Sequence, residues 1–108
     1  MRVTDETAPV SFTDPNAPEL NYPNRITQED FAGWVQERVT FAPREFDSRY
    51  RTFIATNDPG EAPIHGSVIV APLGRGTYVY TTLALFRQFT AGVPGAARLF
   101  VNLLTPPQ

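Results

Sequence analysis

The chain contains no cysteine, no lysine and a single histidine, His65. Without cysteine it can form neither a disulfide nor a thiolate metal site, and it cannot use a cysteine nucleophile. Without lysine it cannot form a Schiff base with a carbonyl substrate. The sequence also lacks an apolar run of about 18 residues, which a membrane-spanning helix requires. These absences remove several classes of enzyme and predict no membrane span.

Charge is scarce and nearly balanced. Nine arginines stand against eleven acidic residues, for a net charge of −2. We therefore do not expect the basic surface that attracts nucleic acids or anionic membranes. The opening residues lack the basic start and apolar stretch of a signal peptide. Two locations remain compatible with the sequence: the cytoplasm, or export as part of a longer parent protein.

What the sequence does contain is the hydrophobic content of a folded domain. Hydrophobic residues make up 42% of the chain and aromatic residues 12%, which is typical of globular proteins. A length of 108 residues fits one domain with a modest core. Residues 1–108 are therefore predicted to form a single module, part of a longer parent.

The first half of the chain gives a weak strand pattern and then a helical one. Residues 7–13 alternate, with Val10 and Phe12 on one face, and predict a short edge strand. Prolines then favour a loop. Thr27 is predicted to begin an amphipathic helix, because it can form a capping pair with Asp30 and because apolar residues recur at helical spacing. Those residues are Phe31, Trp34 and Val35.

The second half gives clearer signals. Segments 67–71 and 77–81 flank a glycine-containing turn and predict a hairpin, and residues 50–55 predict another strand. Residues 83–89 are helical or turn-like. Pro94 is predicted to be the first residue of a final helix. The apolar face of that helix comprises Ala96, Leu99, Phe100, Leu103 and Leu104, with Arg98 and Asn102 away from it.

Catalytic residues are sparse. A hydrolase would have to use His65 with Asp58 or Glu61, which requires a cleft that brings them within hydrogen-bond reach. Ser67 lies two residues from His65, but no Gly-x-Ser-x-Gly turn exposes its hydroxyl. The turn that holds Asp58 and Glu61 lacks the oxygen-rich spacing of a calcium loop. The sequence therefore predicts neither a metal nor a cofactor, and it favours a protein without catalytic activity of its own.

Two kinds of binding surface remain. Trp34, Tyr22, Phe41 and Tyr50 would form a platform for a glycan if their rings were exposed. A buried Trp34 would remove that hypothesis. Polar groups beside apolar ones, Glu37 with Arg38 and Arg87 with Gln88, are candidates for the rim of an interface or are simply solvated.

A set of short motifs, taken in order, resembles one known region. These motifs are Pro23-Asn-Arg-Ile-Thr, Asp30-Phe-Ala-Gly-Trp-Val-Gln-Glu-Arg, Asn57-Asp-Pro-Gly-Glu, Gly74-Arg-Gly-Thr-Tyr-Val-Tyr-Thr, Phe86-Arg-Gln and Ala91-Gly-Val-Pro-Gly-Ala-Ala-Arg-Leu-Phe-Val-Asn-Leu. Together they are similar to the C-terminal region of bacterial PIG-L/LmbE-type N-acetylglucosaminyl deacetylase family proteins. In those proteins a glutamine-amidotransferase-like, flavodoxin-like module follows the zinc deacetylase domain. The likeness covers residues 3–104.

The resemblance implies an accessory module rather than the deacetylase. The family's zinc motif, of the type Ala-His-Pro-Asp-Asp-Glu, has no counterpart in this sequence. The cysteine nucleophile and His-x-Glu pair of class I amidotransferases are also missing, since Gly66 and Ser67 follow His65. The implied partner is a PIG-L-type deacetylase domain, with self-association or a glycan as alternatives.

Together, the patterns and the resemblance predict an α/β or α+β domain. It would have a mixed sheet of four to five strands and two to three helices, resembling the second half of a flavodoxin-like, class I amidotransferase-like domain. The hairpin, the final helix and Trp34 are expected to form the core. The predicted function is that of a non-catalytic accessory or interaction module, with glycan binding and hydrolysis around His65 as the alternatives.

Overall fold

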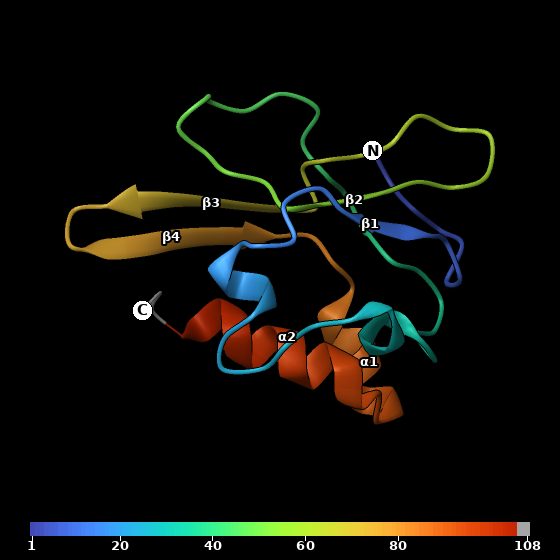
Figure 1. Cartoon of the computed structure of the whole chain (residues 1–108). Helices are drawn as coiled ribbons and strands as arrows, with labels where there is room; N and C mark the ends of the chain where they lie inside the picture. Colours follow the sequence, from blue (N-terminus) through green and yellow to red (C-terminus); the bar gives the residue numbers. More distant parts are fainter. Residues whose placement is uncertain (106–108) are drawn as a thin grey trace.

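Four short strands, two α-helices and two 3-10 helices make up the regular structure of residues 1–105, the part that the computed structural model describes. In chain order they are β1 (Val10–Phe12), η1 (Pro18–Leu20), η2 (Gln28–Phe31), β2 (Ile54–Thr56), β3 (Val68–Leu73), β4 (Gly76–Thr81), α1 (Leu85–Ala91) and α2 (Pro94–Leu104). The strands lie on one side of the molecule and the two α-helices on the other (Figure 1). Helices and strands are thus mixed in an α+β arrangement, in agreement with the coarser part of the prediction.

The strands form two antiparallel pairs, β1 with β2 and β3 with β4. Isolated bridges join further segments, including Arg51 to Val70, and Val39 to both Val3 and Leu83. The single mixed sheet of four to five strands is therefore not what the described residues show. Two small sheets are linked by single bridges, because most of the chain between β1 and β3 is irregular.

The β3–β4 hairpin confirms the prediction for residues 67–81. The strands pair in continuous register from Val68 opposite Thr81 to Leu73 opposite Gly76. A two-residue turn joins them, and its first residue, Gly74, has a φ of 58°. Glycine adopts this left-handed conformation without the steric cost of a Cβ atom, which is why the turn forms here.

The final helix begins at Pro94, as predicted, and buries Ala96, Leu99 and Leu103. Proline suits this position because its missing N–H would have no partner in the first helical turn. The segment predicted as helical or turn-like is helical as α1, and it ends at Gly92 in a left-handed conformation. The tail from residue 106 onward lies outside the described residues.

Asn102 corrects the prediction for the polar side of α2. The side chain is buried rather than turned outward. Its Nδ2 donates to the carbonyl oxygens of Glu19, at 2.9 Å, and Asn24, at 2.7 Å, while its Oδ1 accepts from the Asn24 amide at 3.0 Å. Asn102 therefore fixes the loop between η1 and η2 against the final helix.

The predicted amphipathic helix from Thr27 is wrong beyond its first turn. The capping pair forms, since the Thr27 amide donates to the Asp30 carboxylate at 2.8 Å, but η2 ends at Phe31. The Trp34 indole N–H donates to the Asp30 carbonyl, and the Arg38 guanidinium donates to the Phe31 carbonyl. Side chains satisfy these carbonyls instead of the amides of a continuing helix. Positive φ angles at Gly33 and Gln36 then turn the chain away.

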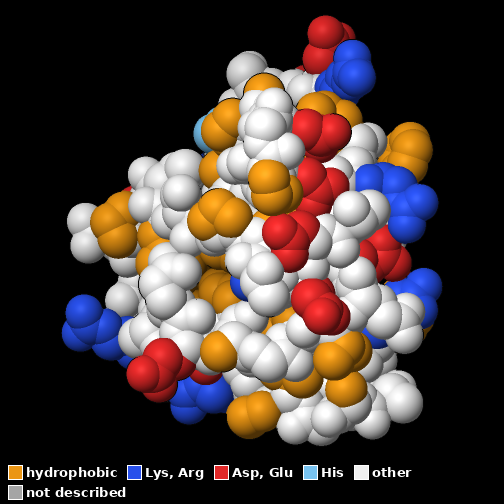
Figure 2. Space-filling model, turned by 90° about the vertical axis from the view of Figure 1, so that its right-hand side faces the viewer, with side chains coloured by type: hydrophobic (Ala, Val, Ile, Leu, Met, Phe, Trp, Pro, Cys, Tyr) orange, Lys and Arg blue, Asp and Glu red, His pale blue; other side chains and the backbone are white. Residues whose placement is uncertain are grey.

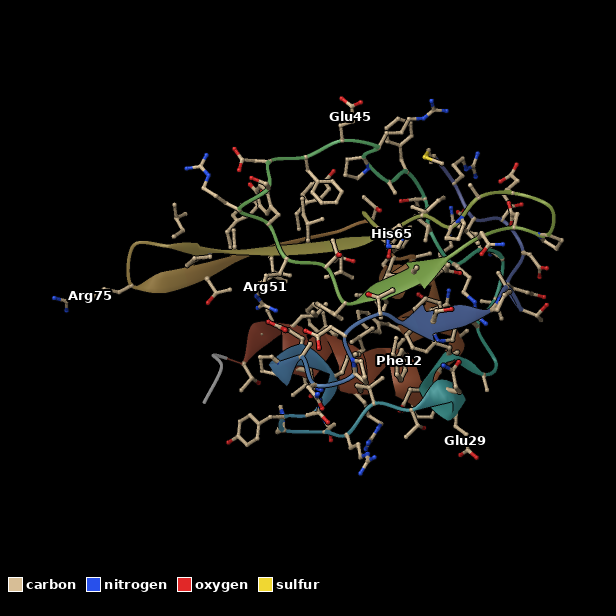
Figure 3. All side chains as sticks on the ribbon, turned by 45° about the horizontal axis from the view of Figure 1, so that its top comes forward. Phe12, Glu29, Glu45, Arg51, His65 and Arg75 are labelled. Atoms are coloured by element: carbon tan, nitrogen blue, oxygen red, sulfur yellow. The ribbon has the colours of Figure 1, made fainter. Side chains whose placement is uncertain are left out.

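The core agrees with the prediction for the hairpin, the final helix and Trp34 but also extends into the first half. Trp34, Val70 and Leu99 belong to one buried cluster. Phe53 and Val3 join the same cluster from the irregular and N-terminal segments. Arg51 adds a side-chain link across the layers, since its two Nη atoms bind both Glu19 carboxylate oxygens, at 3.2 and 2.8 Å. In Figure 3 the Arg51 side chain points from the strand layer toward η1.

Candidate functional site

The segment after η2 packs against α1 and brings together two of the predicted interface residues, Glu37 and Arg87. The Glu37 carboxylate is buried and lies between two arginines. Its Oε2 is 2.9 Å from Nη2 of Arg2, and its Oε1 is 3.2 Å from Nε of Arg87. Arg87 also donates to the Gln36 side chain at 2.6 Å. The expectation that Glu37 lies on a surface rim is therefore wrong for its carboxylate, while Arg87 remains half-exposed.

Arg38 and Trp34 are structural in this fold. Trp34 is 3% exposed. The Arg38 guanidinium lies 5.7 Å from the Phe31 ring centroid and 5.6 Å from that of Trp34, and its Nε donates to the Ala8 carbonyl at 2.9 Å. Burial lowers the pKa of Arg38, and the nearby Asp5 and Glu6 carboxylates oppose that shift. These contacts hold the N-terminal segment, η2 and the following turn together.

The glycan platform loses its central residue because Trp34 has no exposed face. Tyr22 and Phe41 are exposed, and Tyr50 is half-buried. Tyr50 lies edge-on to Tyr78, with ring centroids 6.1 Å apart, beside a cleft of about 310 Å³. The aromatic residues therefore do not form the surface that the sequence suggested around Trp34.

Gln88, expected together with Arg87 at the rim of an interface, is instead fully buried on α1. Its Oε1 accepts from the Val35 amide at 2.7 Å, and its Nε2 donates to the Val35 and Ala84 carbonyls, at 3.0 Å each. In the sequence Gln88 lies among apolar residues of a helical segment, which is compatible with burial. The sequence does not show that Val35 is its partner. Gln88 holds the turn that carries Glu37 in place.

Asp58 anchors the N-terminal segment rather than lining a catalytic cleft. One carboxylate oxygen accepts from the amide and hydroxyl of Thr4, both at 3.0 Å, and the other from the Asp5 amide at 2.7 Å. Partial burial raises the pKa of Asp58, but these hydrogen bonds outweigh it and hold the pKa below its usual value of 3.8. Glu61, in the same turn, is exposed.

A lowered pKa makes Asp58 a source of acid sensitivity. The ionised carboxylate stabilises the fold at pH values above its ordinary pKa, and this contribution disappears as the pH falls below about 4 through the folded-state pKa. We expect Asp58→Asn to lower the free energy of unfolding at neutral pH and to flatten its decline as the pH falls below about 4. Urea unfolding followed by circular dichroism across this range measures both effects. Glu61→Gln is the matched control, and an equal flattening in the control would contradict the assignment.

The residues of the hydrolase alternative are not brought together by hydrogen bonds. His65 is exposed, and within residues 1–105 it makes no hydrogen bond with Asp58 or Glu61. In Figure 3 the side chains of Glu29 and Glu45 point away from His65 at opposite edges of the molecule. Among the described residues no group of three or more histidine or acidic side chains is placed to hold a metal ion. The hydrogen bonds of residues 1–105 therefore pair His65 with neither of the acids proposed for it.

The two α-helices present an exposed apolar surface, which we call the helical apolar face. It comprises Phe86, Phe89, Phe100, Val101 and Leu104, all of them at least 39% exposed. Phe100 and Leu104 were predicted to face the core. The rings of Phe89 and Phe100 pack edge-on, with centroids 5.2 Å apart, so the surface is continuous across the two helices.

Polar residues border this face on one side. A shallow cleft of about 290 Å³ lies where α1 meets the segment after η2, and Gln36, Phe86, Arg87 and Thr90 line part of it. The hydrogen bond between Arg87 and Gln36 crosses this border. An apolar centre with a polar rim is the usual anatomy of a protein–protein interface.

Figure 2 shows a face of mixed character. Acidic side chains follow one another down its middle, arginines lie toward both edges, and hydrophobic side chains lie among them. Within residues 1–105, no helix has both the length and the apolar character needed to cross a membrane.

Neither a protein-family model, nor a curated protein, nor a solved structure matches this chain.

Proposed function

We propose that the chain is an interaction module without catalytic activity of its own, and that it binds a partner domain through the helical apolar face. One observation carries the proposal: large hydrophobic side chains from two adjacent helices form a single exposed surface. Contiguous apolar surfaces of this kind mark binding sites more often than scattered single residues do.

The rest of the site supports binding rather than catalysis. The buried charges of the neighbouring turn are paired, Glu37 with Arg2 and Arg87. Gln88 fixes that turn through both of its amide atoms. The border of the helical apolar face is therefore rigid before a partner arrives, which lowers the entropic cost of association.

The resemblance to the C-terminal region of PIG-L/LmbE-type proteins names the partner to test first, a zinc deacetylase domain of that type. In this proposal the module orients the catalytic domain, and the missing strands of a flavodoxin-like sheet come from outside the chain. The described strands, which form two small antiparallel pairs, are then one part of a larger arrangement.

Binding between the 108-residue chain and a purified PIG-L-type deacetylase domain tests the proposal by calorimetry. We expect Phe89→Ser with Phe100→Ser to weaken the affinity about tenfold or more, because truncation of buried aromatic anchors removes much of an interface's binding energy. Phe41→Ser is the matched control, since Phe41 is 69% exposed and lies outside the helices.

Circular dichroism establishes that each variant is folded before its affinity is compared. The proposal is contradicted if the unaltered chain does not bind, or if the helix variant and the Phe41 variant bind equally well.

A further inference from the structure

Strand β4 has a partner on one side only. Within residues 1–105 it pairs with β3 and with no other strand (Figure 1). Val70 of β3 exchanges two backbone hydrogen bonds with Arg51, at 2.6 and 3.0 Å, so its peptide groups point away from β4. Because the hydrogen-bonding direction alternates along an antiparallel pair, Val79, opposite Val70, points its own peptide groups away from β3. The same alternation directs the peptide groups of Thr77 and Thr81 to the open edge.

This edge lacks the features that usually keep strands from pairing with other chains. Residues 76–81 include no charged residue and no proline, and the register with β3 has no bulge. Natural proteins commonly protect exposed edges with lysine, proline or a bulge. Arg75, the charged residue that precedes the strand, lies in the turn and projects from the tip of the hairpin (Figure 3).

The sequence of the strand is a palindrome. Thr77-Tyr-Val-Tyr-Thr81 reads the same in both directions around Val79. We infer that β4 pairs with β4 of a second copy of this chain, antiparallel and about a two-fold axis through Val79. In that register Val79 opposes Val79 of the second copy, Tyr78 opposes Tyr80, and Thr77 opposes Thr81. Every outward-pointing peptide group of one copy then meets one of the other.

The side chains suit this pairing. Aromatic pairs, pairs of β-branched residues and threonine pairs are among the favourable neighbours across antiparallel strands. Tyr78 and Tyr80 are both exposed. The pairing brings no like charges together, because the strand carries none. A two-fold contact needs a self-complementary surface, and the palindrome supplies one.

A cleft of about 280 Å³ lies between β4 and the end of α2, and Thr77, Val79, Leu103 and Leu104 are among its lining residues. Two strands of six residues bury little surface, so the dimer is a weak one that forms as concentration rises. This contact lies on a different element from the helical apolar face and does not depend on the proposed function.

Sedimentation equilibrium of the 108-residue chain over a wide concentration range tests the inference. We expect a monomer–dimer equilibrium. Because Tyr78 of one copy opposes Tyr80 of the other, the double variant Tyr78→Lys with Tyr80→Lys places like charges across the axis and should raise the dimer dissociation constant about tenfold. The variant Tyr78→Lys with Tyr80→Glu places opposite charges there and should restore dimerisation.

A second pair of variants tests the backbone. Thr77→Pro removes an N–H that points to the open edge, whereas Thr77→Ala keeps it. We expect Thr77→Pro alone to weaken the dimer, again about tenfold, since proline is tolerated where the N–H of an edge strand faces solvent. Circular dichroism confirms the fold of each variant. The inference is overturned if the chain stays monomeric at all concentrations. It is also overturned if the lysine–lysine and lysine–glutamate variants have the same dimer dissociation constant.

Discussion

Replacing Gly95 with alanine is expected to destabilise the fold by about 3 kcal/mol or more. A Cβ atom at Gly95 would overlap the carbonyl group and the Cα of Asp30. These are backbone atoms of η2, so no rotation of a side chain can relieve the overlap. Helix propensity alone favours alanine by about 1 kcal/mol, and the clash outweighs that gain. Urea unfolding monitored by circular dichroism measures the difference.

Gly76→Ala is the control for this experiment. The nearest atom to a Cβ at Gly76, outside its chain neighbours, is the Leu73 carbonyl oxygen at 3.6 Å, an ordinary contact. We expect this control to change the stability by less than about 1 kcal/mol. If Gly95→Ala were no more harmful than Gly76→Ala, the close packing of α2 on η2 would be disproved.

Replacing Gln88 with leucine is expected to cost about 2 to 3 kcal/mol, although leucine has a similar volume. The change leaves the Val35 amide and the Val35 carbonyl without the partners that Gln88 provides at 2.7 and 3.0 Å. The turn that carries Glu37 should then open locally before the whole domain unfolds. Urea unfolding gives the free-energy loss, and hydrogen exchange of the Val35 amide reports the local opening.

Gln36→Leu is the matched comparison. Gln36 is exposed, and its side chain makes one hydrogen bond, with Arg87. Its replacement should cost less than about 1 kcal/mol and leave the exchange of Val35 unchanged. Equal losses for the two leucine variants would show that Gln88 does not hold the turn.

Features set by neighbouring residues could be predicted from the sequence. The hairpin follows from the glycine-containing turn at Gly74 between two strand-forming segments, and Pro94 marks the start of α2. The pairing of Thr27 with Asp30 was also predictable, because both partners lie within one turn. Each of these depends on residues a few positions apart.

Features that depend on residues far apart in the sequence could not be predicted from it. The helix from Thr27 ends early because the Arg38 guanidinium donates hydrogen bonds to the carbonyl oxygens of Phe31 and of the distant Ala8. Gln88 and Asn102 are buried because the backbone they bind is brought to them by tertiary contacts. For the same reason the sequence suggested Glu37 for the rim of an interface, whereas its carboxylate is buried between Arg2 and Arg87.

The bridges at Val39 set an order of events during synthesis on the ribosome. Val39 pairs with Val3 near the beginning of the chain and with Leu83 near its end. Val39 can therefore meet Val3 early, but its pairing with Leu83 cannot form until the chain has been translated past residue 83. Contacts between residues so far apart slow folding, since the loop that joins them must close first. A nascent chain that ends before α1 should consequently remain sensitive to protease, and protection should appear late and in a single step.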